Sequence, residues 1–161
     1  MMKLNSSASH NASNQTDYMD IFKPYLAMNA RHKLLFTQKE VEGIAYVDIG
    51  LLLSKAIESA IDSKRLVMKA DDELEKIINS NLKISSEIGE YIAIKNIGIL
   101  FEPSLKIDLH TKIDSWAKSH VLIILKEGNF HNDIYYLSSE KDSSYSINLN
   151  DINYKTIYDE I

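Results

Sequence analysis

Cysteine is absent from the 161 residues of this chain. The absence excludes a disulfide framework, a thiolate metal site and a cysteine nucleophile. Long apolar runs are absent as well, because stretches such as residues 121–125 are far shorter than the ~20 residues that a bilayer-spanning helix needs. Together these absences favour a cytoplasmic protein and predict neither secretion nor membrane insertion.

Basic charge is scarce: 18 Lys and Arg residues stand against 23 Asp and Glu residues, which gives a net charge of −5. A protein that binds a phosphate backbone without sequence preference needs a basic face. We therefore expect neither nucleic acid nor a membrane as a direct partner.

The short motifs of several catalytic classes are absent too. The phosphate-binding pattern G-x-x-x-x-G-K-[ST] does not occur, and neither does the G-x-S-x-G elbow of serine hydrolases. No H-E-x-x-H or H-x₃-H pair joins the histidines, which we expect to be ordinary surface or terminal residues: His10, His32, His110, His120 and His131. The sequence thus predicts no catalytic, cofactor-binding or metal-binding residue and no cofactor.

What is present is an α/β pattern. Residues 91–94 and 121–125 are apolar at every position, as strands of a parallel sheet that is covered on both faces should be. Residues 32–37 and 44–48 predict two earlier strands. Amphipathic helices are expected at residues 50–62, 71–79 and 108–119, the last with Asp108 as its N-cap, and a docked helix is expected from residue 17 onward.

This pattern predicts a single α/β domain over residues 17–161, with a mostly parallel central sheet flanked by helices. Residues 1–16 are rich in Ser and Asn and predict a flexible N-terminal tail. The core should contain large side chains from most of the expected elements: Leu53, Ile57, Ile94, Leu100, Trp116 and Ile123.

Two details of the pattern carry further expectations. The link of residues 38–43 between the first two strands is shorter than a parallel crossover needs, so these strands should be antiparallel or separated by something unusual. The acidic residues Asp71, Asp72 and Glu73 are expected in the first turn of their helix, where the helix dipole favours negative charge.

The C-terminal part predicts added antiparallel edge strands at residues 134–137 and 145–149, followed by a tail or terminal turn at 154–161. Tyrosine is enriched where proteins dock, and an edge strand offers unpaired backbone groups. We therefore predict a protein-binding surface that contains Tyr135, Tyr136 and Tyr145. The expected partners are other subunits of the same system, with self-association as an alternative.

Four segments are similar to those of a known family: residues 31–37, 46–54, 91–106 with the run ILFEPSLK at 99–106, and 121–128. In this order they resemble the small P-loop protein (BrxF-like) of BREX-type bacterial anti-phage systems. The resemblance covers roughly residues 29–148 of this chain, and the proteins of the family are similar to this chain in length. It implies a degenerate P-loop NTPase-like domain and a place in phage defence.

The chain departs from this family at the positions that phosphoryl transfer needs. The family's first strand runs into a phosphate-binding loop and a helix, whereas here Thr37 is followed only by residues 38–43, and Lys95 stands where the resemblance places a metal-binding Asp. We therefore expect a non-catalytic, protein-binding pseudo-NTPase. The alternative is an enzyme or sensor that binds a nucleotide or small ligand without a P-loop, through the strand-end carboxylates Asp48 and Glu102.

Overall fold

The computed structural model of the chain describes residues 20–138 and 143–157. Its central sheet has six strands, and a separate antiparallel sheet has three. The strands of the central sheet are β1 (Leu34–Thr37), β2 (Tyr46–Asp48), β3 (Lys83–Ser85), β4 (Gly89–Lys95), β5 (Val121–Leu125) and β9 (Lys155–Ile157). The second sheet contains β6 (Asn129–His131), β7 (Ile134–Tyr136) and β8 (Ser146–Asn148).

The helices follow the expected order along the chain. They are a helix of residues 20–27, α2 (Ile49–Ile57), α3 (Leu66–Ser80) and α4 (Leu109–Ser119). Short 3-10 segments lie at Glu58–Ala60, Ile97–Phe101, Pro103–Leu105 and Ser143–Tyr145. No helix in the described part of the chain is both long enough and apolar enough to cross a bilayer.

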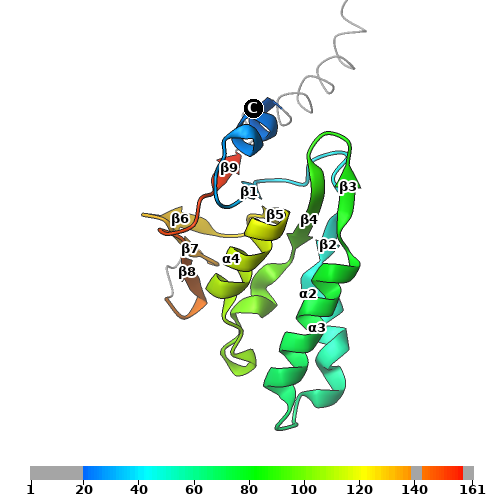
Figure 1. Ribbon diagram of the computed structural model, residues 1–161. Coiled ribbons are helices and arrows are strands. Elements are labelled where there is room, and N and C mark those ends of the chain that lie inside the picture. Colours follow the sequence, from blue (N-terminus) through cyan, green and yellow to red (C-terminus); the bar gives the residue numbers. More distant parts are fainter. Residues whose placement is uncertain (1–19, 139–142, 158–161) are drawn as a thin grey trace, which may run out of the picture.

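The central sheet is mostly parallel, in the order β2-β4-β5-β1-β9, and β3 pairs antiparallel with β4. The middle strands are in register, with Leu35 opposite Ile123 and Ile123 opposite Ala93. The prediction of an α/β domain with a mostly parallel sheet is confirmed (Figure 1). The C-terminal antiparallel strands form a sheet of their own and do not extend the edges of the central one.

Each face of the central sheet is covered by a different set of elements. One face packs against α2, α3, α4 and the three-stranded sheet, through side chains such as Phe36, Ile94 and Ile124. The other face packs against the helix of residues 20–27, which contributes the buried Phe22 and Tyr25. The parallel strands are therefore buried on both sides, which explains why β4 and β5 are nearly all apolar.

The link from β1 to β2, residues 38–45, takes the place of a crossover helix. β1 and β2 are parallel, and β5 and β4 lie between them, so the expectation that the two strands are antiparallel is wrong and the second alternative is right. Val41 and Ile44 of the link are buried in the apolar cluster of the second sheet face. The link thus crosses β5 and β4 and covers part of that face with apolar side chains, which a link of polar residues alone could not do.

Two other expectations need correction, and one strand lies where none was expected. α3 begins at Leu66, so the acidic residues lie beyond its first turn, and Asp71 instead pairs with Lys112 at 2.8 Å. β3 was not predicted, because three residues with an exposed Ile84 give almost no periodic signal. Residues 155–157 form β9 rather than a tail. The predicted tail of residues 1–16 lies outside the described residues.

The predicted core is confirmed, since the six side chains named for it are each at most 4% exposed: Leu53, Ile57, Ile94, Leu100, Trp116 and Ile123. Trp116 lies on the buried face of α4, and its indole N–H donates to Glu75 of α3 at 3.4 Å. The indole therefore joins α3 to α4 within the main core.

Replacing Trp116 with alanine should lower the free energy of unfolding by about 3–5 kcal/mol, because the truncation leaves a cavity among packed side chains. Urea unfolding followed by circular dichroism measures the loss. Trp116→Phe is the matched control and should lose much less, since it keeps an aromatic ring in the same space. An unchanged unfolding midpoint in Trp116→Ala would contradict the buried position.

Candidate functional site

The carboxyl ends of parallel strands are where open α/β sheets bind ligands, so the ends of β2 and β4 come first. Asp48, the last residue of β2, caps α2 by accepting from the backbone N–H of Leu51 at 2.9 Å. The same carboxylate oxygen accepts from the side-chain amide of Asn96 at 2.8 Å. These two hydrogen bonds lower the pKa of Asp48 and hold it as an ion within its own chain.

Lys95 and Glu40 join the end of β4 to the link. The Lys95 ammonium donates to the Glu40 carboxylate at 3.1 Å, which ties β4 to the segment that crosses the sheet. An ammonium group at this strand end repels a metal cation. The position therefore serves to fix the link.

The end of β5 is closed in the same way. The carboxylate of Glu127 accepts from the backbone N–H of Ile97 at 2.8 Å. The hydroxyl of Tyr135 accepts from the N–H groups of Glu127 and Gly128, each at 2.9 Å. The backbone donors that follow β5, which could otherwise approach an anion, point instead at a tyrosine of the second sheet.

The carboxylates proposed for a ligand site are not joined by any hydrogen bond in residues 20–138 and 143–157. Glu102 lies between two 3-10 segments and lines two surface hollows, whereas Asp48 bonds to Leu51 and Asn96. Within the same residues, no group of three His, Asp or Glu side chains could share a metal ion. A ligand at Asp48 would have to displace both the helix cap and the Asn96 amide.

His32 departs from the expectation of surface histidines. It is 1% exposed, and its Nε2 lies 2.6 Å from a carboxylate oxygen of Asp114. The backbone N–H of Asn153 donates to Nδ1 at 3.2 Å, which places the ring proton on Nε2, toward Asp114. The ring thus ties the chain before β1 to α4 and to the segment before β9. This role could not be predicted from the sequence, because Asp114 and Asn153 are far from His32 in the chain.

The predicted tyrosines belong to the second sheet and its flanking segment, and they differ in position. Tyr135 is 1% exposed and packs within an aromatic cluster with Phe36 of β1, at a ring distance of 5.6 Å, and with Phe130 of β6, at 5.2 Å. The prediction that Tyr135 belongs to an exposed binding surface needs correction, because its ring lies in the core. Its role is to fasten the second sheet to the central one.

Tyr136 and Tyr145 are half-buried. Tyr136 follows Tyr135 in β7, so its side chain projects from the opposite face of the small sheet, away from the core. Tyr145 ends the 3-10 segment before β8 and packs partly against the main core. Of the three predicted residues, Tyr136 has the position that best suits contact with a partner.

Two more aromatic residues belong to this region: Phe130, which the sequence did not single out, and Tyr154, which it indicated only as one of the C-terminal tyrosines. Phe130 stacks on Tyr154 with ring centroids 5.0 Å apart, and the Tyr154 hydroxyl donates to Asp133 at 2.6 Å. Gly128 is needed beside them, because a side-chain carbon there would clash with the backbone oxygen of Tyr136. Local alternation in β6 and β7 could have shown that Phe130 and Tyr135 share a face, but Tyr154 required the tertiary fold.

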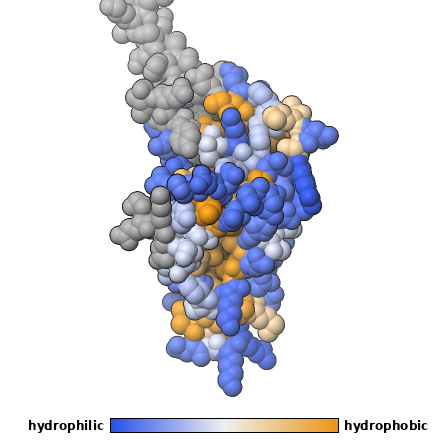
Figure 2. Space-filling view, turned by 90° about the vertical axis from the view of Figure 1, so that its left-hand side faces the viewer, coloured by the Kyte–Doolittle hydropathy of each residue, from blue (hydrophilic) through white to orange (hydrophobic). Residues whose placement is uncertain are grey.

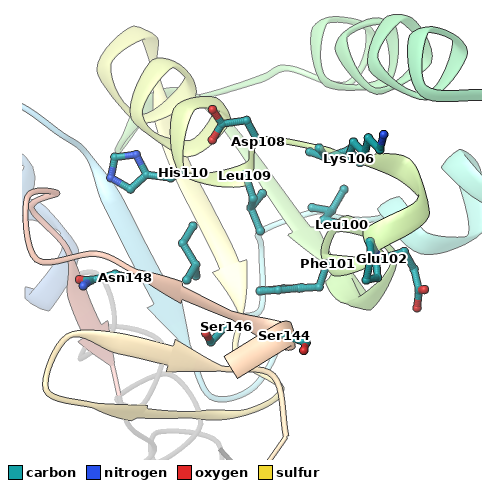
Figure 3. Close-up of a pocket in the computed structure, with 13 residues that line it drawn as sticks. Leu100, Phe101, Glu102, Lys106, Asp108, Leu109, His110, Ser144, Ser146 and Asn148 are labelled. Atoms are coloured by element: carbon teal, nitrogen blue, oxygen red, sulfur yellow. The ribbon is translucent and has the colours of Figure 1, made fainter. Parts of the chain in front are cut away.

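A groove of about 440 Å³ lies between β8, the N-terminus of α4 and the 3-10 segments that follow β4. Figure 2 shows hydrophobic atoms at the bottom of a hollow on this side of the molecule, with hydrophilic side chains around it. In Figure 3, Leu100, Phe101 and Leu109 project into the space between α4 and β8. The volume is within the range of roughly 300–1,000 Å³ that is typical of ligand pockets.

No protein-family model, no curated protein and no solved structure matches the chain.

The His32–Asp114 contact predicts a measurable acid response. Hydrogen bonds from Lys118 and then His32 lower the pKa of Asp114 from 3.8 to about 2. A carboxyl group whose pKa is lower in the folded state than in the unfolded state stabilises the fold when it is ionised. This stabilisation is fully present above the unfolded-state pKa and is lost as the pH falls from about 4 toward 2. In urea unfolding over this range, Asp114→Asn should show a smaller decrease in midpoint than the wild type.

Asp62→Asn is the matched control for this measurement, since Asp62 is exposed and has no ion pair among the described contacts. It should follow the wild-type pH profile. Parallel profiles for the wild type and Asp114→Asn would contradict a stabilising role for the ionised Asp114.

Proposed function

We propose that this protein is a non-catalytic, protein-binding subunit of a prokaryotic multi-protein system that defends against phage. The observation that carries the proposal is the closed carboxyl edge of the sheet, where Asp48, Lys95 and Glu127 bond to partners within the chain. The chain also leaves β1 directly into residues 38–45, without a loop that could surround a phosphate. Both features support a scaffold that no longer uses this edge for nucleotide chemistry.

Binding of another protein is supported by the second sheet. It packs on the core through Tyr135 and turns the half-buried Tyr136 away from it. The sheet has only three short strands, so its two outer strands leave backbone groups that a partner strand can pair with. A small sheet fixed rigidly to a larger domain is a suitable platform for a partner protein.

Phage defence rests on the resemblance of residues 29–148 to the small P-loop protein of BREX-type systems. Genes that flank the coding sequence bear on this part of the proposal. Neighbouring genes for a methyltransferase, a phosphatase-like protein and a large ATPase would support it, whereas an isolated metabolic operon would count against it.

The alternative of a ligand-binding enzyme or sensor assigns Asp48 and Glu102 to the ligand. Asp48 is less suitable for this role because its carboxylate already accepts two hydrogen bonds, one of which caps α2. Loss of a helix cap costs about 1 kcal/mol. A ligand would have to compensate for this loss in addition to its own ordering.

Replacing Tyr136 with Glu should abolish co-purification with native partners while the domain stays folded, because a charge on the outer face of the small sheet opposes burial in an interface. The measurement is affinity purification of the tagged full-length chain from its native host, followed by mass spectrometry of the bound proteins.

Two controls separate the interface from general effects of charge. Tyr136→Phe keeps the ring and should retain the partners, and Ile84→Glu places the same charge on the exposed strand β3 of the central sheet. Both should behave like the wild type. A folded Tyr136→Glu variant that recovers every partner would place the interface elsewhere, and a wild-type chain without specific partners would overturn the proposed function.

A further inference from the structure

The groove beside β8 combines a free strand edge with an apolar floor. The residues that line it include Leu100 and Phe101 after β4, Leu109 at the start of α4, and Ser146, Ile147 and Asn148 of β8. Because β8 contributes all three of its residues, the groove runs along the strand, as Figure 3 shows.

The hydrogen-bond register shows which backbone groups face the groove. Leu149 N–H donates to the Asp133 carbonyl and Leu137 N–H donates to the Tyr145 carbonyl, and Tyr135 pairs with Ile147 between them. Hydrogen-bonded and non-hydrogen-bonded pairs alternate in an antiparallel ladder, so the N–H and C=O groups of Ser146 and Asn148 point away from β7. Within residues 20–138 and 143–157, no backbone partner outside the strand reaches these two residues.

The floor and the rim limit what can occupy the groove. Leu100, Phe101 and Ile147 form part of the main core and are at most 9% exposed, so an apolar side chain seated there extends the core. The acidic side chains on the rim are Glu102 and Asp108 and the only lysine among the described lining residues is Lys106, while His110 lies 2.7 Å from Asp151. The Asp108 carboxylate already accepts from the backbone N–H and the hydroxyl of Thr111, so Glu102 is the carboxylate left for a partner. The described rim thus carries two carboxylates against one lysine, and a basic side chain of a partner is favoured beside Glu102.

We propose that this groove binds an extended segment of a partner protein, which adds a fourth strand to the small sheet along β8. Its backbone pairs with the outward N–H and C=O groups of Ser146 and Asn148, and alternate side chains enter the groove because successive residues of a strand point to opposite faces. The segment carries an apolar residue above Leu100, Phe101 and Ile147 and a Lys or Arg near Glu102. This inference rests on the proposed protein-binding function and specifies its site.

The decisive variants are Asn148→Pro and Asn148→Ala. Both lose the side-chain oxygen that accepts from the N–H of Asn150, so they match in their effect on the turn after β8. Only proline removes the outward N–H, and it leaves the bonds to β7 intact because that N–H faces the free edge. Ile147, the preceding residue, is in a strand, which suits the residue before proline.

The probe is a displayed library of random linear peptides, selected on the full-length chain. Enriched peptides should alternate apolar and polar residues and include Lys or Arg, and by fluorescence polarisation they should bind the wild type and Asn148→Ala alike. Asn148→Pro should weaken binding about tenfold or more, since one hydrogen bond is lost and the ring obstructs the added strand. Glu102→Gln should weaken the basic peptides about two- to threefold, mainly at low salt.

Circular dichroism and thermal unfolding establish that each variant is folded before binding is compared. Peptides that bind Asn148→Pro as tightly as Asn148→Ala overturn the proposal, and so does a selection that yields no binder or only helical, acidic ones. If native partners co-purify with folded Asn148→Pro as well as with the wild type, the groove is not their binding site. The proposed protein-binding function would still stand. A wild-type chain that recovers no partner at all defeats the proposed function itself.

Discussion

Burial of both faces of β1, β4 and β5 is the constraint on which the rest of the structure depends. Three apolar parallel strands cannot leave either face in water, so each face needs a cover. α2, α3 and α4 cover one face together with the small sheet, and the helix of residues 20–27 covers much of the other. The remaining part of that second face is covered by the link after β1, through Val41 and Ile44. The same link supplies Glu40 to Lys95, so covering the sheet also closes its carboxyl edge.

The aromatic cluster around Phe36 connects this constraint to function. Phe36 contacts Phe130 edge to face at 4.9 Å and Tyr135 at 5.6 Å, so β1 holds the second sheet directly. Because Tyr135 points inward, Tyr136 must point outward, and the pairing of Tyr135 with Ile147 sends the backbone groups of Asn148 to the free edge. The hydroxyl of the same tyrosine accepts from the N–H groups of Glu127 and Gly128. Tyr135 thus both bonds the backbone that follows β5 and sets which face of β7 and which edge of β8 point outward.

The sequence predicted the parts of the fold that have strong local signals. The runs of β4 and β5, the amphipathic face of α4 and the Asp108 cap were recognisable because burial on two faces, helical periodicity and capping each leave a pattern in consecutive residues. β3, β6 and β9 escape prediction because these three-residue strands carry few apolar side chains and lie among polar residues, whereas the equally short β2 and β7 lie in longer apolar or aromatic runs. The start of α3 is expected too late because its N-cap residue, Arg65, makes no side-chain capping hydrogen bond. For the candidate site, the sequence indicated the tyrosine region, but it could not decide which tyrosine is buried, since this depends on the contact of Tyr135 with Phe36 across the fold.

The carboxyl edge of the sheet is occupied by the chain's own polar contacts, and on this ground we propose that the edge binds no nucleotide. Asp48 caps α2, Lys95 is paired with Glu40, and the backbone donors after β5 are bonded to Tyr135. Titration calorimetry of the full-length protein with Mg-ATP tests this claim most directly. We expect no heat of binding beyond the heat of diluting Mg-ATP into buffer. A saturable isotherm with a dissociation constant in the low micromolar range would contradict it.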